Sequence, residues 1–397
     1  MNLTVYDEEI LKKDIAVNHL RPYQQCSISV MDTIADPNIL FDGKGICNYY
    51  YNYLEAESSM VFKGEEGETK LAEIVEIIKK DGKGKKYDCI MGVSGGVDST
   101  YLALQAKKLG LRPLVVHFDN GWNSELAVKN IENIISRLEF DLYTLVIDWE
   151  EFKDLQLAYL NASVVDIEVI TDHAIIGTFY RLANQYGLKY ILSGNNIVTE
   201  HVLPSSWIFN KGDDRNIRDI HRQFGKRPLK TYPFFSFKQR RYYTHMKGIE
   251  TIPILNFMPY NTKDIKEIII KELGWRDYGG KHYESVFTRF YQGYILPVKF
   301  KIDKRKAHLS NLIFSGQMTK SEALEELAKP IYDAELLKND KEFVLKKLDL
   351  NEEEFEALMN LPRREHREFR YIRQVLESYP LLKVFKPLWR LIKEKKN

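Results

Sequence analysis

Hydrophobic residues in the middle of the chain alternate between short continuous runs and longer helical stripes. Short apolar runs bounded by turn residues are typical of buried strands in a parallel sheet; they occur at residues 88–93, 114–118, 142–147 and 190–193. Helical patterns lie between them, at residues 100–109, 125–138 and 173–186. Gly110 and Gly187 follow two of these patterns, where a helix commonly ends in a left-handed residue. The alternation predicts an α/β fold with a parallel sheet covered on both faces.

The two ends of the chain have a different pattern. A polar stretch, Gly64–Glu68, separates the first residues from the helical pattern that follows. After residue 300 only helical patterns appear, near residues 319–327, 341–348, 351–359 and 365–376, and the first of them opens with a capping box, Thr319 to Glu322. We therefore predict a small N-terminal unit (1–62), an α/β domain (63–300) and a helical C-terminal region (301–397).

Composition narrows the class of protein. The 397 residues are 44% hydrophobic and 29% charged, which excludes disordered and low-complexity proteins. The 58 Lys and Arg against 56 Asp and Glu give a net charge of +2, which argues against binding of nucleic acid by overall charge. No run reaches the ~18 to 20 apolar residues of a transmembrane segment, and the N-terminus lacks the pattern of a signal peptide. We expect a cytoplasmic protein.

The most informative segment lies between the first strand and its helix. Two glycines there let the backbone approach a pyrophosphate and present N–H groups to it, hydroxyls add donors at the helix N-terminus, and Asp98 suits a magnesium ion that bridges phosphate oxygens. The residues predicted to bind ATP are Ser94, Gly95, Gly96, Val97, Asp98, Ser99 and Thr100. The Gly-Lys-Ser/Thr ending of the nucleoside-triphosphatase loop is absent. The alternative is a tight strand-to-helix turn with no ligand.

This segment resembles the pyrophosphate loop (PP-loop) of the N-type ATP pyrophosphatases, a group that includes asparagine, GMP and NAD synthetases. Further blocks look like those of one branch, the N-acetyl sugar amidotransferases of bacterial surface polysaccharide synthesis. The blocks are residues 117–124, 193–200, 278–285, 302–310 and 315–319. The resemblance implies a Rossmann-like PP-loop domain, with ATP and Mg²⁺ as cofactors.

It also implies a reaction. An amide carbonyl is a poor electrophile toward ammonia because its oxygen is a poor leaving group. Adenylation of the N-acetyl oxygen of a nucleotide-linked acetamido sugar turns that oxygen into part of AMP, which ammonia displaces to give an acetamidino group. Such products belong to lipopolysaccharide, O-antigen and nonulosonic acid synthesis. The expected enzyme is thus an AMP- and pyrophosphate-forming amidotransferase.

The source of ammonia is predicted to be another protein. A built-in glutaminase needs a nucleophilic cysteine in a suitable site, but position 2 is Asn2 and none of the three cysteines lies in a glutaminase sequence. The resemblance implies a separate glutaminase and a barrel-shaped subunit that conducts ammonia, similar to the two parts of imidazole glycerol phosphate synthase.

Other residues follow from their position at strand ends or from the resemblance. Val116, His117 and Phe118 end the second strand and are expected beside the adenine, while Gly194 follows the fourth strand and suits close approach to ATP. Lys281 is predicted to be catalytic, together with Asp98, by reaching phosphate; an ordinary solvated lysine is the alternative. The expected contacts with the sugar nucleotide are Glu200, His201, His282 and Arg305. The charged stretch around Arg305 also suits an exposed helix start.

The N-terminal unit departs from the resembled family, whose members carry two Cys-x-x-Cys pairs there, consistent with a structural zinc. The first pair reads Cys26 to Ser29 and the second Cys47 to Tyr50, so two of four thiolates are missing. We expect no zinc at this site.

Two other functions remain open. A tRNA-modifying enzyme of the thiolation type would use the same adenylation, although sulfur transfer generally needs a reactive cysteine. A non-catalytic scaffold for the glutaminase complex would fit the lost cysteines but not the intact loop.

Overall fold

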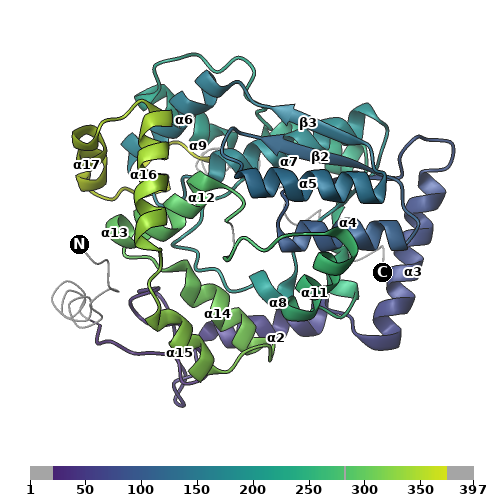
Figure 1. Cartoon of the computed structure of the whole chain (residues 1–397), viewed down its shortest axis with the longest axis horizontal. Coiled ribbons are helices and arrows are strands. Elements are labelled where there is room, and N and C mark those ends of the chain that lie inside the picture. Colours follow the sequence, from purple (N-terminus) through teal and green to yellow (C-terminus); the bar gives the residue numbers. More distant parts are fainter. Residues whose placement is uncertain (1–20, 281–282, 373–397) are drawn as a thin grey trace, which may run out of the picture.

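A five-stranded sheet forms the centre of the protein in the computed structural model, which describes residues 21–280 and 283–372 (Figure 1). All neighbouring strands run parallel, in the order β3-β2-β1-β4-β5. The strands are β1 (Cys89–Gly92), β2 (Pro113–Asp119), β3 (Leu142–Val146), β4 (Tyr190–Leu192) and β5 (Glu250–Ile252). The predicted α/β class with a Rossmann-like parallel sheet is confirmed.

Helices surround the sheet and make up most of the regular structure. From the N-terminus to β4 they are α2 (Asn48–Met60), α3 (Gly64–Asp81), α4 (Val97–Lys108), α5 (Glu125–Leu138), α6 (Trp149–Ala162) and α7 (Val169–Gln185). Then follow α8 (Ile197–Glu200), α9 (Asp214–Phe224), α10 (Phe237–Arg241), α11 (Thr262–Leu273), α12 (Val286–Phe290), α13 (Leu296–Phe300), α14 (Lys304–Phe314), α15 (Lys320–Ala328), α16 (Ala334–Leu348) and α17 (Glu352–Asn360). Short π- or 3₁₀-helical turns are η1 (Tyr242–Met246), η2 (Ile254–Phe257), η3 (Tyr291–Ile295) and η4 (His366–Glu368).

The two faces of the sheet are buried under different helices. Because side chains alternate along a strand, Val115 of β2 packs in the cluster formed with α4, α5 and α11, whereas Val116 packs against α7. The helices α4, α5 and α11 therefore cover one face of the sheet and α7 covers the other, while the carboxyl ends of β1, β2 and β4 open into a common cavity.

Several boundaries differ from the sequence-based expectation. The strand β5 was not predicted, because three residues beside Pro253 give no clear pattern. The strand β3 is an edge strand rather than a buried one, and Leu142 and Val146 are 39% and 67% exposed. The helix α7 begins at Val169, before the predicted His173.

The C-terminal region is helical through α17, and the predicted capping box of Thr319 and Glu322 opens α15. The expected helix from residue 365 is wrong for residues 365–371, whose only helical part is the short turn η4, whereas Ile372 is helical. The carboxylates of α9 take the backbone donors that a helix would use: Asp219 accepts from the Arg370 N–H at 3.0 Å and Asp213 from the Ile372 N–H at 2.8 Å. Residues 373–376 of that prediction lie outside the described residues.

The N-terminal unit brings its two cysteines together. The Cys47 N–H donates to the Cys26 sulfur at 3.3 Å, Ser29 lies 3.9 Å from the Cys47 sulfur, and both cysteines are fully buried. The side-chain hydrogen bond between the two cysteines lowers the pKa of Cys26 and raises that of Cys47. Among residues 21–280 and 283–372, no cluster of three or more His, Cys, Asp or Glu suits a metal ion. The expectation that no zinc binds stays a prediction.

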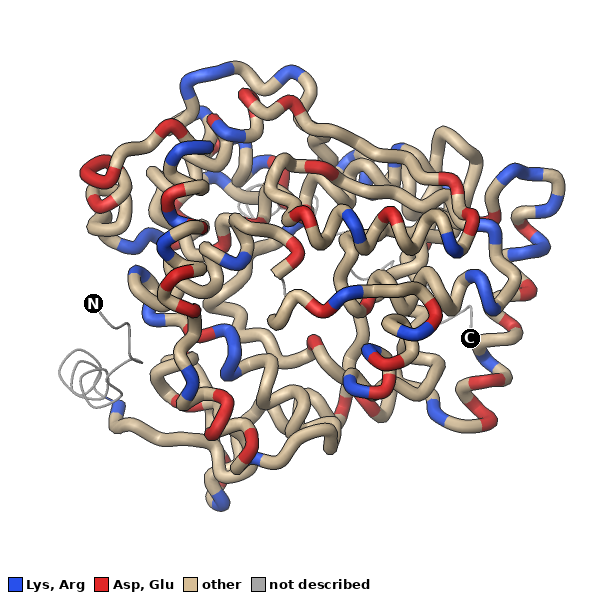
Figure 2. The backbone as a smooth tube through the Cα atoms, in the orientation of Figure 1, with Lys and Arg blue, Asp and Glu red and all other residues tan. Residues whose placement is uncertain are grey.

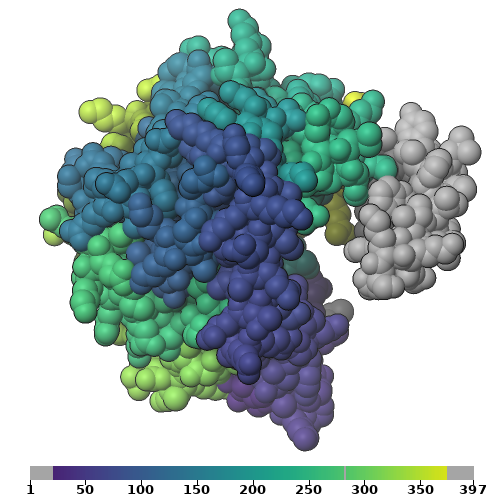
Figure 3. Space-filling view, turned by 90° about the vertical axis from the view of Figure 1, so that its right-hand side faces the viewer, coloured from purple at the N-terminus to yellow at the C-terminus, as the bar shows by residue number. Residues whose placement is uncertain are grey.

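The N-terminal unit and the C-terminal helices pack side by side, α2 against α14 (Figures 1 and 3). The buried Asp32 pairs with Lys306 of α14, and Lys320 of α15 donates to the carbonyl of Cys26 at 2.7 Å. One hydrophobic cluster includes Cys26 at one end of the chain and Phe369 at the other. The division into three domains stays a prediction, and its described parts share this core.

Positive and negative side chains are interspersed along most elements (Figure 2). No helix of the described part of the chain is long and apolar enough to cross a membrane.

Candidate functional site

The loop between β1 and α4 is held by its own side chains. The Ser99 hydroxyl lies 3.2 Å from both the Ser94 N–H and the Ser94 hydroxyl, and the Gly96 N–H donates to the Ser94 hydroxyl at 3.2 Å. Thr100 donates to the Gly96 carbonyl at 2.7 Å. These contacts fold the loop around the N-terminus of α4, where backbone N–H groups and the helix dipole favour an anion.

Gly95 cannot be replaced by another residue without rearrangement. Its φ is +80°, and a Cβ would lie 2.8 Å from the carbonyl oxygen of Ala127 in α5. The indole of Trp275 donates to its carbonyl at 2.8 Å. The loop is therefore clamped between α5 and the segment that follows α11, which keeps its shape independent of a ligand.

Asp98 stands in the first turn of α4 and accepts from two neighbours. Tyr260 donates to it in a short hydrogen bond, and the Asn196 amide donates at 3.4 Å. Burial, followed by the charge of Asp98, raises the pKa of Tyr260 well above its ordinary range. Gly194, after β4, approaches the same turn so closely that its Cβ would lie 3.4 Å from the Asp98 carbonyl group.

These residues fit ATP and Mg²⁺. The glycines leave the backbone free to approach a ligand, serine hydroxyls and N–H groups supply donors for phosphate, and Asp98 supplies one carboxylate. Magnesium bound to nucleotide phosphates usually takes only one or two carboxylates from the protein, so a dedicated cluster of acids is unnecessary.

The loop opens into a cavity of about 900 Å³, called here the large cavity. Its lining comes from the loop, the carboxyl ends of β1, β2 and β4, the helix α7, and the residues Tyr278, Gly280 and Glu284. Ligands of open parallel sheets bind at this edge. The volume is at the upper end of the range of roughly 300–1,000 Å³ for small-molecule sites, which leaves room for more than one ligand.

The end of β2 contributes Val116, His117 and Phe118 to the large cavity, and their place beside the adenine stays a prediction. His117 Nδ1 lies 3.1 Å from the Val93 carbonyl oxygen, so Nδ1 carries the hydrogen and Nε2 is left as an acceptor. The Asn123 amide lies 3.1 Å from Nε2. The imidazole is thereby fixed in one orientation between the first two strands.

The helix α7 supplies the opposite wall. Its residues Asp172, Ile176, Phe179 and Tyr180 lie on one helical face and line the cavity. Phe179 packs directly on Gly92, where a Cβ would come within 2.5 Å of its ring. The apolar part of this wall, Ile176 and Phe179, suits a flat, weakly polar group such as a purine base.

The outer part of the α7 wall carries charges of both signs. Asp172 precedes Phe179 by two helical turns, which places it about 10 Å farther along α7. There Lys211 pairs with Asp166 at 2.8 Å and with Asp172 at 3.1 Å. Burial lowers the pKa of Lys211, but the charges of the two carboxylates outweigh it and raise the pKa above its ordinary value.

Arg240 of α10 lies beside this pair. Its guanidinium is within 2.8 Å of the position that a Cβ on Gly212 would take, and both residues line the large cavity. Among the described residues no carboxylate forms an ion pair with Arg240. The cations Lys211 and Arg240, with the amide of Asn210, form what we call the outer rim.

Tyr278 and Glu284 complete the cavity on the side of the loop. A Cβ on Gly96 would lie 3.3 Å from the Tyr278 hydroxyl and 3.5 Å from Glu284. Burial, followed by the charge of Glu284, raises the pKa of Tyr278 strongly. The predicted residues Lys281 and His282 lie outside the described residues, although Gly280 and Glu284 on either side of them line the cavity.

Of the remaining predicted residues, some line the large cavity and others do not. Ser94, Gly96, Val97, Asp98, Ser99, Gly194 and Glu200 line the large cavity. Gly95 and Thr100 are buried behind the loop, where they shape it rather than face the cavity. His201 packs against Tyr53 of α2, and Arg305 is bound to Asp303 and to carbonyls at the end of α15, so the structure does not bring these two side chains to the cavity.

Several cavity residues were not found from the sequence. In the sequence, Phe179 and Ile176 have the spacing of the apolar face of an ordinary helix. Tyr260 and Arg240 lie in segments that contain no recognisable motif. Glu284 was inside a recognised block but was not singled out. Gly92 offered a usable signal, because a glycine at the end of a buried strand marks close approach by another group.

Residues 284–383 match the family model described as "LPS biosynthesis protein WbpG-like, C-terminal domain". An uncharacterised protein of Methanocaldococcus jannaschii is 26% identical over 315 residues, which cover 77% of this chain and 94% of that protein. The tRNA(Ile)-lysidine synthase of Chlamydia pneumoniae is 37% identical over 76 residues, 18% of this chain and 23% of that enzyme.

Among solved structures, the NH3-dependent NAD synthetase of Campylobacter jejuni aligns over 75% of this chain and 98% of its own, with 13% identity and a TM-score of 0.28. The match of residues 284–383 confirms the resemblance to proteins of surface polysaccharide synthesis: this part of the chain is similar to a domain family of lipopolysaccharide biosynthesis.

Proposed function

We propose that the protein is an ATP-dependent amidotransferase that converts the N-acetyl group of a nucleotide-linked acetamido sugar into an acetamidino group. The observation that carries the proposal is the loop between β1 and α4, which is held by hydrogen bonds among its own residues and faces a cavity large enough for ATP and part of a second substrate. The match of residues 284–383 to a family of lipopolysaccharide biosynthesis supports the substrate class.

In the first half-reaction the N-acetyl oxygen forms a bond to the α-phosphorus, the bond from that phosphorus to the bridging oxygen breaks, and pyrophosphate leaves. The amide N–H proton is released to solvent, which gives a neutral imidate. The donors of Ser94, Gly96 and Ser99 are positioned to hold the leaving pyrophosphate at the N-terminus of α4. Asp98 would hold Mg²⁺, which neutralises phosphate charge. Tyr260 and Asn196 fix the direction of the Asp98 carboxylate through their hydrogen bonds.

In the second half-reaction ammonia forms a bond to the imidate carbon. The bond from that carbon to the AMP oxygen breaks, and the electron pair leaves with AMP. The hydrogens of ammonia remain on the two nitrogens of the amidinium product. A water-poor cavity favours this step over hydrolysis, and the apolar wall of Ile176 and Phe179 reduces the space for water.

The outer rim suits the sugar nucleotide. A nucleotide-linked sugar carries a phosphate or diphosphate, and Arg240, which pairs with no carboxylate among residues 21–280 and 283–372, is well placed to bind it. Lys211 adds positive charge, although Asp166 and Asp172 compensate much of it. We therefore assign ATP to the loop and the phosphates of the second substrate to Arg240.

Mass spectrometry tests the reaction. The protein is incubated with ATP, magnesium, ammonium and a panel of acetamido sugar nucleotides. A product lighter than its substrate by the difference between O and NH, formed with equal amounts of AMP and pyrophosphate, supports the proposal. Glutamine should replace ammonium only when a separate glutaminase and its barrel-shaped partner are added; use of glutamine by the isolated chain contradicts the proposed source of ammonia.

A tRNA-modifying enzyme is the second candidate, favoured by the 76-residue match to tRNA(Ile)-lysidine synthase. Sulfur transfer is disfavoured because Cys89 is fully buried and burial raises its pKa, which keeps the thiol protonated. Binding of tRNA at two salt concentrations distinguishes the candidates: tight, salt-dependent binding would favour the tRNA enzyme.

A further inference from the structure

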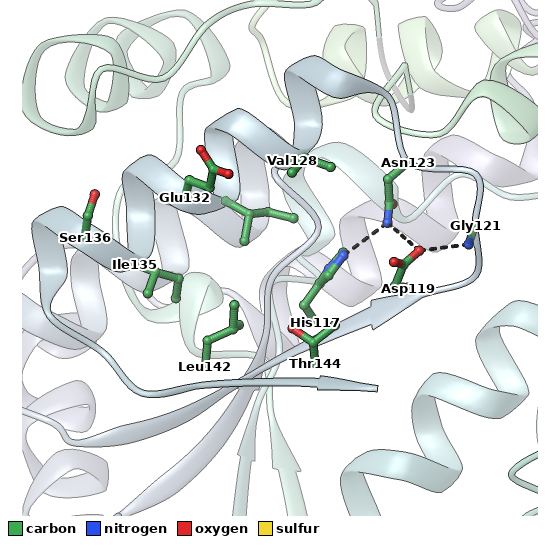
Figure 4. Close-up of a pocket in the computed structure, with 11 residues that line it drawn as sticks. His117, Asp119, Gly121, Asn123, Val128, Glu132, Ile135, Ser136, Leu142 and Thr144 are labelled. Carbon is green, nitrogen blue, oxygen red and sulfur yellow. Dashed lines mark hydrogen bonds between the residues drawn. The ribbon is translucent and has the colours of Figure 1, made fainter. Parts of the chain in front are cut away.

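A second cavity of about 630 Å³ lies between α5 and the edge strand β3 (Figure 4). We call it the small cavity. Its walls carry the apolar side chains Val128, Ile131 and Ile135 of α5 and Leu142 of β3. Val128 and Leu142 are 43% and 39% exposed, so the small cavity opens to solvent between these two elements.

The small cavity shares two residues with the large cavity. His117 and Asn123 line both of them. Figure 4 shows the two side chains at one end of the small cavity, where β2 ends and the segment before α5 begins. They therefore form the boundary between the surface near β3 and the space in front of the phosphate loop.

Hydrogen bonds fix the polar atoms of this boundary. One hydrogen of the Asn123 amide points to His117 Nε2 at 3.1 Å and the other to the Asp119 carboxylate at 3.2 Å. The Asp119 carboxylate also accepts from the Gly121 N–H at 2.8 Å. Both amide hydrogens are thus used, and the boundary offers acceptors, the Asn123 and Asp119 oxygens, to a molecule that carries N–H groups.

The charges of the two cavities differ. The lining of the small cavity contains the carboxylates of Asp119 and Glu132 and no Lys or Arg among the described residues. Lys347 lies close outside, on the Gly121 carbonyl, and Lys129 pairs with Glu132. The large cavity is lined by Lys211, Arg240 and Lys266, and also by the carboxylates of Asp98, Asp172, Glu200 and Glu284. The large cavity therefore offers cations to a phosphate beside its carboxylates, whereas the described lining of the small cavity offers none.

We propose that the small cavity is the entry for ammonia, which passes His117 and Asn123 to reach the large cavity. The inference rests on the proposed function, since it supplies the nitrogen of that reaction. ATP and the sugar nucleotide would occupy the large cavity, so a small nucleophile needs another way in. The apolar walls favour neutral ammonia over ammonium, because burial of a charge is costly.

Two tryptophan substitutions test the entry from opposite walls. Val128→Trp on α5 and Leu142→Trp on β3 both place an indole in the mouth of the small cavity, at positions exposed enough to accept it. Val298→Trp is the matched control, since Val298 of α13 is 37% exposed and does not line the small or the large cavity. Melting temperatures identify any variant that is destabilised.

Two reactions are measured with saturating ATP, magnesium and sugar nucleotide. Exchange of labelled pyrophosphate into ATP, which needs no ammonia, reports adenylation and should stay within twofold of wild type. The KM for ammonium in amidine formation should rise at least about tenfold in both mouth variants and remain unchanged in Val298→Trp.

An unchanged KM for ammonium in both mouth variants, with exchange intact, overturns the entry and leaves the proposed function standing. Loss of exchange in folded mouth variants also overturns it, because the small cavity would then serve adenylation. Absence of exchange in the wild type with every sugar nucleotide overturns the proposed function and the entry together.

Discussion

The loop between β1 and α4 and the charged stretch Asp303–His308 both supplied candidate site residues in the sequence, yet their side chains are used differently. In the loop, Ser94, Asp98 and Ser99 face the large cavity. In the second stretch, Arg305 binds Asp303 and the end of α15, and Lys306 binds Asp32 of the N-terminal unit. Of this stretch, only His308 lines the large cavity.

The difference follows from what surrounds each segment. The loop lies at the open edge of a parallel sheet, beside the large cavity, so its polar side chains keep room in front of them. Asp303–His308 starts a helix between two packed units, where any buried charge needs a partner. Polar residues thus mark a ligand site only where the fold leaves space beside them.

The largest expected effect is on the loop. Asp98→Asn keeps the shape of the side chain but removes the charge that would hold Mg²⁺, so adenylation should fall at least ~100-fold, about 2.7 kcal/mol of transition-state stabilisation. Single-turnover formation of AMP at saturating ATP measures it. The melting temperature without ligand serves as the control. A wild-type rate of adenylation in Asp98→Asn would mean that Asp98 contributes no more to the reaction than the packed side chains of Asp303–His308.

The opposite result is expected for Lys306. Lys306→Met leaves the buried Asp32 without its cation, but Asp32 keeps the backbone N–H groups of Ile34 and Ala35, so the cost should be about 2 kcal/mol rather than the 3–5 kcal/mol of a fully unpaired charge. Denaturant unfolding gives the free energy. Adenylation by the folded variant should match wild type; a lost rate with unchanged stability would place Lys306 in the site.

A smaller effect is predicted at the outer rim. Arg240→Ala should raise the KM for the sugar nucleotide about tenfold, ~1.4 kcal/mol, with little change in the KM for ATP. Arg241→Ala is a control of identical chemistry, since Arg241 contacts the Phe237 ring and does not line the cavity. Equal effects of the two substitutions would exclude a specific role for Arg240.

The smallest predicted effect is a change in the free energy of unfolding with pH. It concerns His366, which is buried and does not line the large cavity. Burial lowers its pKa from 6.5 to about 3, so the folded state stays neutral while the unfolded state takes up a proton below about pH 6.5. Stability should therefore fall as the pH drops through this window, by about 1 kcal/mol between pH 7 and pH 5.5. The slope of unfolding free energy against pH should be smaller in His366→Gln; an equal slope would assign the effect to other groups.

Periodicity predicted most of the central fold because each buried strand and its helix have local signals. The strands β1, β2 and β4 and the cap of α15 were found in this way. The helix expected from residue 365 failed because Asp213 and Asp219, about 150 positions earlier in the chain, bind its backbone. Local patterns contain no information about such partners.

The same limit applies to the site. The loop was predictable because its residues act within one turn, with Ser94, Ser99 and Gly96 bonded to each other. Phe179 and Arg240 belong to the cavity only because α7 and α10 fold against the strand ends. Arg305 was assigned to the substrate because its charge was visible, whereas its partners at the end of α15 were not.

Oxygen transfer tests the central claim most directly. A sugar nucleotide labelled with ¹⁸O in its N-acetyl carbonyl is incubated with ATP, magnesium, ammonium and the protein, and the AMP is analysed by mass spectrometry. If the carbonyl oxygen attacks the α-phosphorus, every AMP formed with an amidine carries the ¹⁸O label. Amidine formation with unlabelled AMP, or AMP formation independent of any acetamido sugar, would contradict adenylation of the N-acetyl group.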